Sequence, residues 1–250
     1  MTGDFELQIL LPIHNEAASI ERTVHEIYDE ISPRVRLQFI FCEDGSTDDT
    51  QAVLRRLAGQ VPAKLILSEA RKGYSRAVRD GMQAQDAPWL LCLDSDGQCD
   101  PRDFWQFWEA RDGSDVLLGW RVNRADNPMR RVMSRTFYRF WKALYRVPVH
   151  DPSCPFMLTR ARVISRLVGT LGAMEQGFWW EFVARAWRSG FSIQEFPVNH
   201  RERAAGETQV YKLGKLPGIG YRHFVALFRI LAETRTAEPL FGAARRKIAS

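Results

Sequence analysis

The first 120 residues alternate short apolar runs with longer segments of helical pattern, and this alternation limits the possible folds more than any other feature. The apolar runs, each of strand length, cover residues 7–12, 37–42, 64–67, 89–93 and 115–120. The segments of helical pattern between them cover residues 16–30, 47–58 and 74–85. Such an alternation predicts an α/β fold, in which helices flank a mainly parallel central sheet.

The second half of the chain is predicted to be mostly helical. Residues 129–145 carry apolar side chains with a helical period, and the opposite face is basic, without an acidic residue. A proline-rich turn follows, and then a strand that ends at Pro197. The further predicted helices cover residues 161–171, 178–189 and 221–233, the last after a loop at 201–220. No linker composition separates the halves, so we expect a single domain over 1–235 and a basic tail over 236–250.

Composition and charge exclude several classes of protein. Hydrophobic residues make up 45% and charged residues 26% of the chain, which is typical of a globular domain rather than a disordered one. The longest stretch without Asp, Glu, Lys or Arg is residues 7–15, too short for the roughly 20 apolar residues of a membrane span. The four cysteines lack metal-ligand spacing, and no leader pattern is present. We therefore expect reduced thiols and a cytoplasmic location.

Acidic motifs follow the predicted strands, at the edge of the sheet where ligands bind in α/β folds. Asp94-Ser95-Asp96-Gly97-Gln98 comes directly after the strand at 89–93. Two carboxylates and an amide oxygen are suitable ligands for Mg²⁺ or Mn²⁺. The alternative is a polar turn that leads into a helix at Pro101, because Asp and Gly are common turn residues.

Two further motifs lie at the ends of the first and second predicted strands. In Glu43-Asp44-Gly45-Ser46-Thr47-Asp48-Asp49-Thr50, a carboxylate at the strand end is suited to accept from a nucleobase N–H or a ribose hydroxyl. Helix capping accounts for residues 46–50, but not for Glu43 and Asp44, which precede the cap. In the motif at 12–16, Pro-Ile-His-Asn-Glu, Glu16 is expected to face the same cleft as Asp44.

Together these motifs resemble the family 2 inverting glycosyltransferases, which have the GT-A fold. Within that family the chain is most similar to the polyprenyl-phosphate glycosyltransferases, the dolichyl-phosphate mannose synthase group. The resemblance covers nearly the whole chain and implies an enzyme with an acceptor-side helical subdomain. It divides the domain into a nucleotide-sugar-binding half, 1–120, and an acceptor-binding half, 121–235. The motifs that carry it lie at residues 11–16, 43–48, 71–77, 93–98, 119–121, 181–186, 190–198 and 203–208.

The resemblance implies roles for individual residues on the donor side. Asp94, Asp96 and Gln98 are expected to bind a divalent metal, Mn²⁺ or Mg²⁺, that stabilises the leaving diphosphate. The catalytic residues are predicted to be Asp96, Arg203 and Asp151, with Arg203 near the diphosphate of the donor. The residues expected around the GDP- or UDP-sugar are Pro12, His14, Glu16, Asp44, Asp94, Ser95 and Asp96.

On the acceptor side, the resemblance implies that Arg121, Arg130 and Ser134 bind the phosphate of a polyprenyl-phosphate lipid. On a helix, Arg130 and Ser134 share one face, so both side chains can reach one phosphate. The alternative for this basic face is simple solvation. A phosphate acceptor is already a nucleophile, whereas a soluble hydroxyl acceptor needs a general base, for which Asp151 is the candidate. A non-catalytic surface-binding module is a third hypothesis.

A lipid acceptor requires contact with the membrane, directly or through a partner protein. The basic helix at 129–145 and the helix at 221–233, with its apolar stripe, are suited to binding at the cytoplasmic face of a membrane. The alternative is that both apolar stripes pack on the core. Nucleic-acid binding is not expected, because the aromatic residues have core spacing. A nucleotidyltransferase would have a glycine-rich loop, and residues 12–16 contain no glycine.

Overall fold

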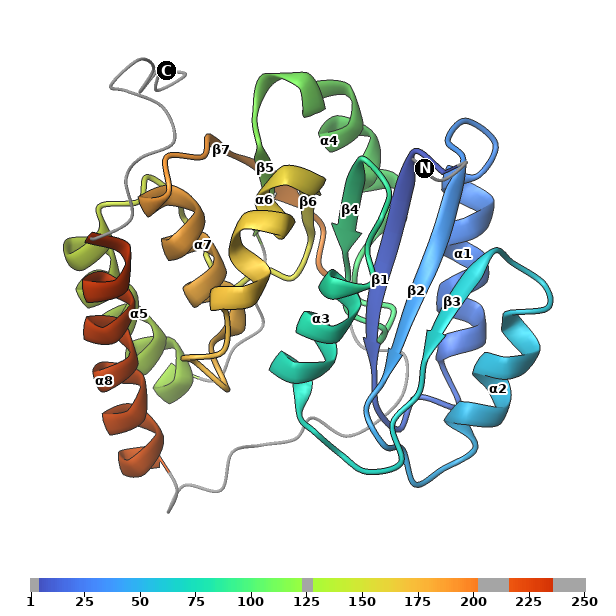
Figure 1. Ribbon diagram of the computed structural model, residues 1–250, viewed down its shortest axis with the longest axis horizontal. Helices are drawn as coiled ribbons and strands as arrows, with labels where there is room; N and C mark the ends of the chain where they lie inside the picture. Colours follow the sequence, from blue (N-terminus) through green and yellow to red (C-terminus); the bar gives the residue numbers. More distant parts are fainter. Residues whose placement is uncertain (1–4, 123–127, 202–215, 236–250) are drawn as a thin grey trace.

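The computed structural model describes residues 5–122, 128–201 and 216–235, although the side chains of residues 128–135, 216–219, 221 and 235 are outside this description. Its centre is a seven-stranded sheet in the order β3-β2-β1-β4-β6-β5-β7 (Figure 1). The strands are β1 Leu7–Ile13, β2 Leu37–Glu43, β3 Ala63–Ile66, β4 Trp89–Cys92, β5 Val116–Arg121, β6 Met157–Arg160 and β7 Ile193–Val198. The helices are α1 Ile20–Ile31, α2 Thr50–Leu57, α3 Tyr74–Gln83, α4 Phe104–Ala110, α5 Pro128–Tyr145, α6 Ala161–Leu167, α7 Phe178–Arg188 and α8 Leu216–Arg235.

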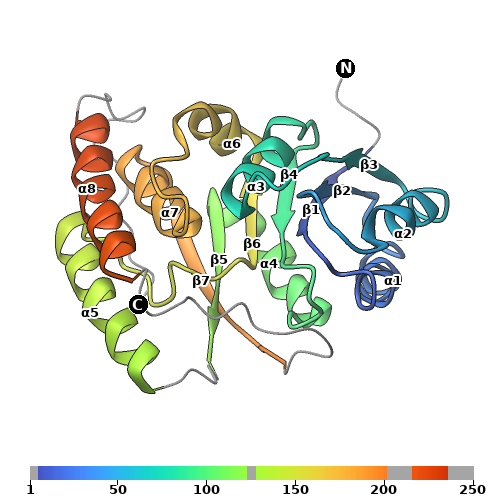
Figure 2. The ribbon, with the colours of Figure 1, turned by 90° about the horizontal axis from the view of Figure 1, so that it is seen from below.

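The sheet is mainly parallel, as the sequence predicts. β1 pairs in parallel with β2 and β4, β2 with β3, and β5 with β7. β6 runs antiparallel to both β4 and β5 and joins the two parallel parts. Helices cover both faces: α1, α2 and α4 lie on one side, and α3, α6 and α7 on the other (Figures 1 and 2). The α/β prediction is therefore confirmed.

The core is centred on β1, whose seven residues are all buried. Burial on both faces is typical of a central parallel strand covered by helices. One of the seven, Gln8, is polar, and its amide is fully used: Nε2 donates to Gln38 Oε1 (2.8 Å) and Asp86 Oδ1 (2.6 Å). Its Oε1 accepts from the N–H groups of Asp86 (2.8 Å) and Ala87 (3.2 Å). These bonds connect β1 to β2 and to the segment before β4.

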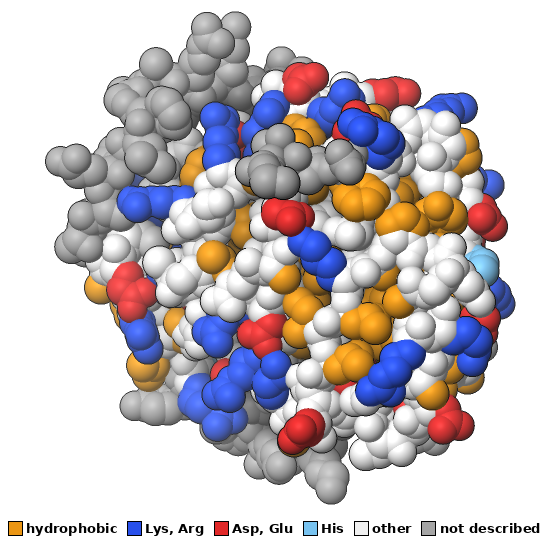
Figure 3. Space-filling view, turned by 45° about the vertical axis from the view of Figure 1, so that its right-hand side comes forward, with side chains coloured by type: hydrophobic (Ala, Val, Ile, Leu, Met, Phe, Trp, Pro, Cys, Tyr) orange, Lys and Arg blue, Asp and Glu red, His pale blue; other side chains and the backbone are white. Residues whose placement is uncertain are grey.

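α5 and α8 lie side by side at the β7 end of the molecule, beyond α7 (Figures 1 and 2). Trp141 and Tyr145 of α5 are buried, and the Tyr145 hydroxyl donates to the Leu227 carbonyl (2.6 Å). The face shown in Figure 3 mixes basic, acidic and hydrophobic side chains without a large region of one charge. Within the described residues, no helix is both long enough and apolar enough to cross a membrane.

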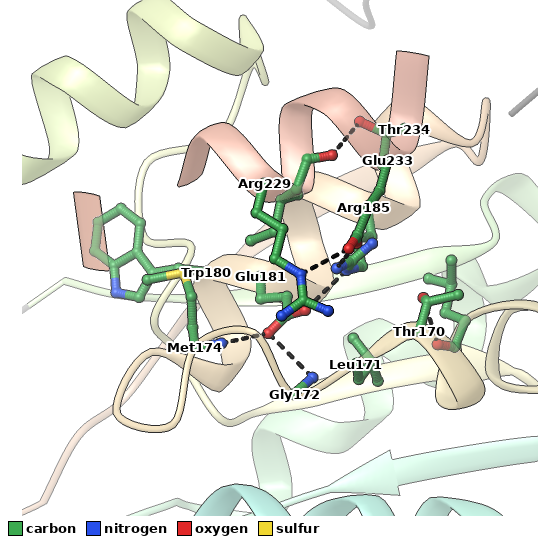
Figure 4. A network of polar contacts seen from close by, with 12 residues as sticks. Thr170, Leu171, Gly172, Met174, Trp180, Glu181, Arg185, Arg229, Glu233 and Thr234 are labelled. Atoms are coloured by element: carbon green, nitrogen blue, oxygen red, sulfur yellow. Dashed lines mark hydrogen bonds and ion pairs between the residues drawn. The ribbon is translucent and has the colours of Figure 1, made fainter. Parts of the chain in front are cut away.

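A buried ionic network joins α7 to α8 (Figure 4). Arg185 Nε donates to Glu181 Oε1 (2.8 Å) and Arg185 Nη2 donates to Glu233 Oε2 (2.6 Å). Glu181 Oε2 accepts from the N–H groups of Gly172 (3.2 Å) and Met174 (2.8 Å), in the segment before α7. Because Glu181 is fully buried and each of its oxygens is hydrogen-bonded, this network fixes α7 relative to the segment before it and to α8.

Several element boundaries differ from the sequence predictions. α1 begins at Ile20 rather than at residue 16, because residues 16–19 form a turn in which the Ser19 N–H donates to the Glu16 carbonyl (3.0 Å). α8 begins at Leu216 rather than at residue 221, since proline is tolerated in the first turn of a helix. A helix after the Asp94–Gln98 motif was expected only in the alternative of a polar turn, and α4 follows a short 3₁₀ turn at Pro101–Asp103. β6 was not predicted. β6 has only four residues and directly follows a proline-rich segment that has no strand pattern.

Replacing Gly81 with alanine should destabilise the fold. A Cβ at this position of α3 would clash with Cys42 Sγ and lie 2.6 Å from Leu10 Cδ1, so these buried side chains would have to move. Overpacking of this kind costs about 1–3 kcal/mol of unfolding free energy. Urea denaturation measures the loss. The matched control is Gly169→Ala, where an added Cβ has no described heavy atom within 4 Å. Equal stability of the two variants would contradict close packing at Gly81.

Candidate active site

Three loops meet at the carboxyl ends of β1, β2 and β4. The Asp44 N–H donates to the Ile13 carbonyl (2.9 Å), and the Ser95 hydroxyl donates to the Pro12 carbonyl (2.9 Å). Since β1 lies between β2 and β4 in a parallel arrangement, the three strands end at the same edge. The structure thus brings together Pro12, Asp44 and Ser95, which the sequence predicts for one site.

The loops after β1 and β2 are hydrogen-bonded to each other. Asn15 Oδ1 accepts from the Thr47 N–H (2.8 Å), and the Asn15 N–H donates to the Ser46 hydroxyl (2.9 Å). Asp48 Oδ1 accepts from the Thr50 N–H (3.0 Å) at the start of α2. Asp48 thus binds the first N–H of α2, whereas the N-cap residue Asp49 makes no side-chain capping bond. The capping interpretation is wrong for Ser46 and Thr47, which bind the neighbouring loop. This is also why α2 begins at Thr50 and not at residue 47.

Glu43 is a structural carboxylate at the end of β2. One oxygen accepts from the Ser46 N–H, and the other accepts from Gln51 Nε2 (2.7 Å) and the Ser68 N–H (3.4 Å). Burial alone would raise the pKa of Glu43, but the hydrogen bonds from Ser46, Gln51 and Ser68 stabilise the charged form more strongly. The net effect is a pKa below its ordinary value.

Asp44 is nearly buried and is held by the segment between β3 and α3. Its Oδ1 accepts from the N–H groups of Lys72 (2.6 Å) and Gly73 (3.0 Å), and its Oδ2 lies 3.9 Å from Arg71 Nε. Gly73 has a φ of 96°, in the left-handed region that favours glycine. The Arg71-Lys72-Gly73 segment therefore fixes the orientation of the Asp44 carboxylate.

Glu16 and His14 also lie at this edge. Glu16 is largely buried, and its Oε2 accepts from the Ser19 hydroxyl (2.5 Å). His14 Nδ1 is a buried atom that has no hydrogen-bond partner among the described residues. Buried polar atoms normally have a partner, so this nitrogen is an exception among the described residues.

The Asp94–Gln98 loop follows β4 and contacts two distant segments. Asp94 Oδ1 accepts from the Tyr74 hydroxyl (3.0 Å), and Asp96 Oδ1 accepts from the Gln98 N–H (3.1 Å). Gln98 Nε2 donates to the Arg201 carbonyl (3.1 Å), and the Arg201 N–H donates to the Gln98 carbonyl (2.9 Å). The loop is thus attached both to the start of α3 and to the segment after β7.

The residues of this loop fit a hard divalent cation. Asp94, Asp96 and Gln98 present only oxygen ligands, because Gln98 Nε2 is bound to Arg201 and its Oε1 remains the ligand atom. Among the described residues, no group of three His, Cys, Asp or Glu side chains forms a metal site by itself. A cation held by this loop would therefore complete its coordination with ligands from a bound molecule, as Mg²⁺ does with substrate phosphates.

Arg121 and Asp151, predicted to have different roles, form one buried ion pair. Arg121 Nε donates to Asp151 Oδ2 (2.8 Å), and Arg121 Nη2 donates to Asp151 Oδ1 (3.0 Å) and to the Ser153 hydroxyl (2.8 Å). Burial by itself would lower the pKa of Arg121, but the hydrogen bonds and charge of Asp151 outweigh it and raise that pKa. Arg203 lies outside the described residues, as do the side chains of Arg130 and Ser134.

Three residues near the predicted site were not predicted from the sequence. Tyr74 binds Asp94, Trp179 binds Tyr74, and Arg201 binds Gln98. The Trp179 indole N–H donates to the Tyr74 hydroxyl oxygen (2.8 Å). Arg201 Nη2 lies 2.9 Å from Asp100 Oδ1, just after the Asp94–Gln98 loop. No periodicity or spacing in the sequence relates these three residues to Asp94. The one feature that could have indicated them is that they lie in or next to the motifs that carry the family resemblance.

Comparison with known proteins assigns the family. The model of the family described as "Glycosyl transferase family 2" matches residues 8–168. The chain belongs to this family, which confirms the family that its motifs predict.

Its relatives include enzymes named for polyprenyl-phosphate substrates. The chain is 29% identical to glycosyltransferase AglD of Haloferax volcanii, over 86% of this chain and 36% of that protein. It is 29% identical to dodecaprenyl-phosphate galacturonate synthase of Rhizobium johnstonii, over 80% of this chain and 60% of that protein. It is 26% identical to dolichyl-phosphate hexose transferase of Haloferax volcanii, over 82% and 86% respectively. The chain therefore spans less than two thirds of the first two relatives, and its similarity to the polyprenyl-phosphate group is confirmed.

Solved structures confirm the GT-A fold. Glucosyl-3-phosphoglycerate synthase of Mycobacterium tuberculosis superimposes with a TM-score of 0.68 at 17% identity, over 92% of this chain and 81% of that one. A complex of the same enzyme with Mn²⁺, UDP-glucose and phosphoglyceric acid superimposes with a TM-score of 0.65 at 18% identity, over 92% and 80% of the two chains.

The Glu43→Gln variant should alter the dependence of stability on pH. Because the folded-state pKa of Glu43 is lowered, its carboxylate stabilises the fold above its unfolded pKa of about 4.3. That contribution disappears as the pH falls through the folded-state pKa. At pH 7 the variant should lose about 1–2 kcal/mol of unfolding free energy, and the difference from wild type should shrink at pH 3. Urea denaturation at both pH values measures this, and a pH-independent difference would contradict it.

Proposed function

We propose that this protein transfers one sugar, with inversion, from a UDP- or GDP-sugar to a polyprenyl phosphate and that it requires Mn²⁺ or Mg²⁺. The observation that carries the proposal is the meeting of the Asp94–Gln98 loop with Pro12 and Asp44 at one edge of the sheet. The names of the relatives support a polyprenyl-phosphate acceptor. The neighbouring structure with Mn²⁺ and UDP-glucose supports the donor class and the metal.

On the donor side, we propose that residues 1–120 bind the nucleotide-sugar. Pro12, His14, Glu16 and Asp44 surround the nucleoside, and Ser95 holds the loop against β1. Asp94, Asp96 and Gln98 hold the cation, which supplies Lewis-acid stabilisation of the leaving diphosphate when it is bound.

Arg203 is proposed to add a second positive charge at the diphosphate. The N–H and carbonyl of Arg201, two residues earlier, are both hydrogen-bonded to Gln98. Arg203 lies two residues further along the sequence, so the attachment of Arg201 to the proposed cation loop supports this role.

On the acceptor side, the Arg121–Asp151 pair favours a phosphate over a hydroxyl. An arginine that binds both carboxylate oxygens stabilises the charged carboxylate, so Asp151 is poorly suited to take up a proton as a general base. Its bonds use Nε and Nη2 of Arg121, and the Nη1 edge makes no hydrogen bond to the described residues. We propose that Asp151 positions Arg121, which binds the acceptor phosphate together with Arg130 and Ser134 of the half at 121–235.

An exposed apolar patch on α5 and α8 supports contact with a membrane surface. Phe224, Val225 and Phe228 of α8 are 49%, 47% and 45% exposed, and Phe140 of α5 is 37% exposed. The rings of Phe140 and Phe224 stack at a centroid distance of 5.3 Å. The alternative, in which the stripe of α8 packs on the core, does not hold for these residues, because α8 buries Ala226, Leu227 and Ile230 instead.

Basic residues flank this patch, since Arg139, Lys142, Arg222 and Arg229 are exposed on the same two helices. A combination of apolar and basic side chains binds anionic lipid surfaces. We propose that α5 and α8 rest on the cytoplasmic face of the membrane, directly or next to a partner protein, where the acceptor phosphate is accessible.

The transfer is tested with purified protein, a panel of UDP- and GDP-sugars, polyprenyl phosphate, and Mn²⁺ or Mg²⁺ with or without EDTA. Mass spectrometry of the lipid should show a product from one donor that EDTA abolishes. Asp96→Asn should reduce the rate at least about 100-fold, because it weakens metal binding at the leaving group. The matched control is Asp86→Asn, whose carboxylate contacts Gln8 and Lys64 before the start of β4.

The acceptor class is tested in the same assay with soluble hydroxyl acceptors. Products on these acceptors only, together with loss of activity in Asp151→Asn, would favour the alternative of a hydroxyl acceptor and a general base. Slow hydrolysis of one nucleotide-sugar without any acceptor product would support the donor site and contradict the lipid acceptor.

Membrane contact is tested by co-sedimentation with vesicles of phosphatidylcholine and phosphatidylglycerol. The double variant Phe224→Ser/Phe228→Ser should bind at least about 10-fold more weakly, because two exposed aromatic side chains no longer enter the lipid. Val122→Ser is the matched control, since Val122 is 56% exposed and lies outside α5 and α8. Equal binding of wild type and the double variant would contradict the role of this patch.

A further inference from the structure

Two hydrogen bonds connect α7 to the Asp94–Gln98 loop through the hydroxyl of Tyr74. The Trp179 indole N–H donates to the Tyr74 oxygen (2.8 Å), and the Tyr74 O–H donates to Asp94 Oδ1 (3.0 Å). An indole nitrogen can only donate and a phenol has one hydrogen. The direction of both bonds is therefore determined, and the single hydrogen of Tyr74 is directed to Asp94.

Tyr74 also follows directly, in the sequence, the two residues that hold the Asp44 carboxylate. The N–H groups of Lys72 and Gly73 bind the Asp44 carboxylate, and Tyr74 is the first residue of α3. Three consecutive residues thus contact the two carboxylates that we assign to opposite ends of the donor, one at the nucleoside and one at the cation. A displacement of this segment would move both carboxylates together.

The partner of Tyr74 is held rigidly from the other side. Trp179 is 5% exposed, and its ring packs against Phe178 and Phe182. The start of α7 is fixed by Glu181, as described above (Figure 4). A separate bond, from the Ser75 hydroxyl to the Glu175 carbonyl (2.6 Å), attaches α3 directly to the segment before α7.

We infer that Tyr74 is a positioning residue, held by Trp179, that orients the Asp94 carboxylate for the divalent cation. This inference rests on the proposed function, because it assumes that Asp94 binds the metal. Partners that orient a metal ligand change metal affinity by about 10- to 100-fold when they are removed. The bond from Trp179 makes this orientation depend on α7, which belongs to the half of the domain that we assign to the acceptor.

The test is the affinity of the purified chain for Mn²⁺ in the presence of saturating UDP or GDP, whose diphosphate supplies the remaining ligands, measured by isothermal titration calorimetry against a titration of the nucleotide alone. Tyr74→Phe removes only the hydroxyl and should weaken Mn²⁺ binding about 10-fold, with an unchanged melting temperature. Trp179→Phe should weaken binding less. Added to Tyr74→Phe, it should have no further effect, because the bond to Asp94 is already absent.

Two variants control for the loss of a similar hydrogen bond elsewhere. Tyr138→Phe removes a hydroxyl that donates to the Val149 carbonyl (2.6 Å), and Trp105→Phe removes an indole N–H that donates to Glu30 Oε1 (2.7 Å). Both should bind Mn²⁺ like wild type. Asp94→Asn, which should lose Mn²⁺ binding, is the reference for the site.

The outcomes separate this inference from the proposed function. If wild type binds Mn²⁺, Asp94→Asn does not, and Tyr74→Phe binds as tightly as wild type, the positioning role is overturned and the proposed metal site stands. Additive effects of Tyr74→Phe and Trp179→Phe would overturn the connection through Trp179. If wild type itself does not bind Mn²⁺ in the presence of UDP or GDP, the proposed metal site is wrong and the inference falls with it.

Discussion

The whole candidate site depends on one arrangement, the parallel pairing of β1 with β2 on one side and β4 on the other. Parallel strands end at a common edge, so three loops far apart in sequence meet there. β1 is fully buried and pairs with both neighbours, so its backbone sets the register of the three strands. Without this pairing, the Asp44 N–H would not reach the Ile13 carbonyl, and the Ser95 hydroxyl would not reach the Pro12 carbonyl.

The carboxylates of the candidate site share a second feature, which is that other protein groups hold each of them in a fixed orientation. Glu43 and Asp44 accept backbone N–H groups, Asp94 accepts the Tyr74 hydroxyl, and Asp151 pairs with Arg121. Fixed orientation reduces the reorganisation that a site needs when charge develops on its substrate. In the transfer that we propose, that charge develops at the leaving diphosphate, so preorganised carboxylates near it are suited to the proposed reaction.

Most of the fold and part of the site were predictable from local patterns. Strands of four to seven residues and amphipathic helices have their own periodicity, and the motifs at 43–50 and 94–98 follow their strands directly. β6 was not predictable, because it is short and directly follows a proline-rich segment without a strand pattern. The start of α2 was not predictable, because Ser46 and Thr47 bind Asn15 of another loop. The contact of Tyr74 with Trp179 joins residues separated by 105 positions, and no local pattern encodes such a distance.

By itself, the sequence determined the strand and helix alternation, the acidic residues at the strand ends and the family, because each of these depends on residues close together in the chain. Only the tertiary structure decided which carboxylates pair with which partners. It joined Arg121 to Asp151, directed Tyr74 to Asp94, and turned Phe224, Val225 and Phe228 outward while α8 buried another stripe. The physical reason is that hydrogen bonds and burial depend on distances in space, which are set when the strands pair and the helices pack on them.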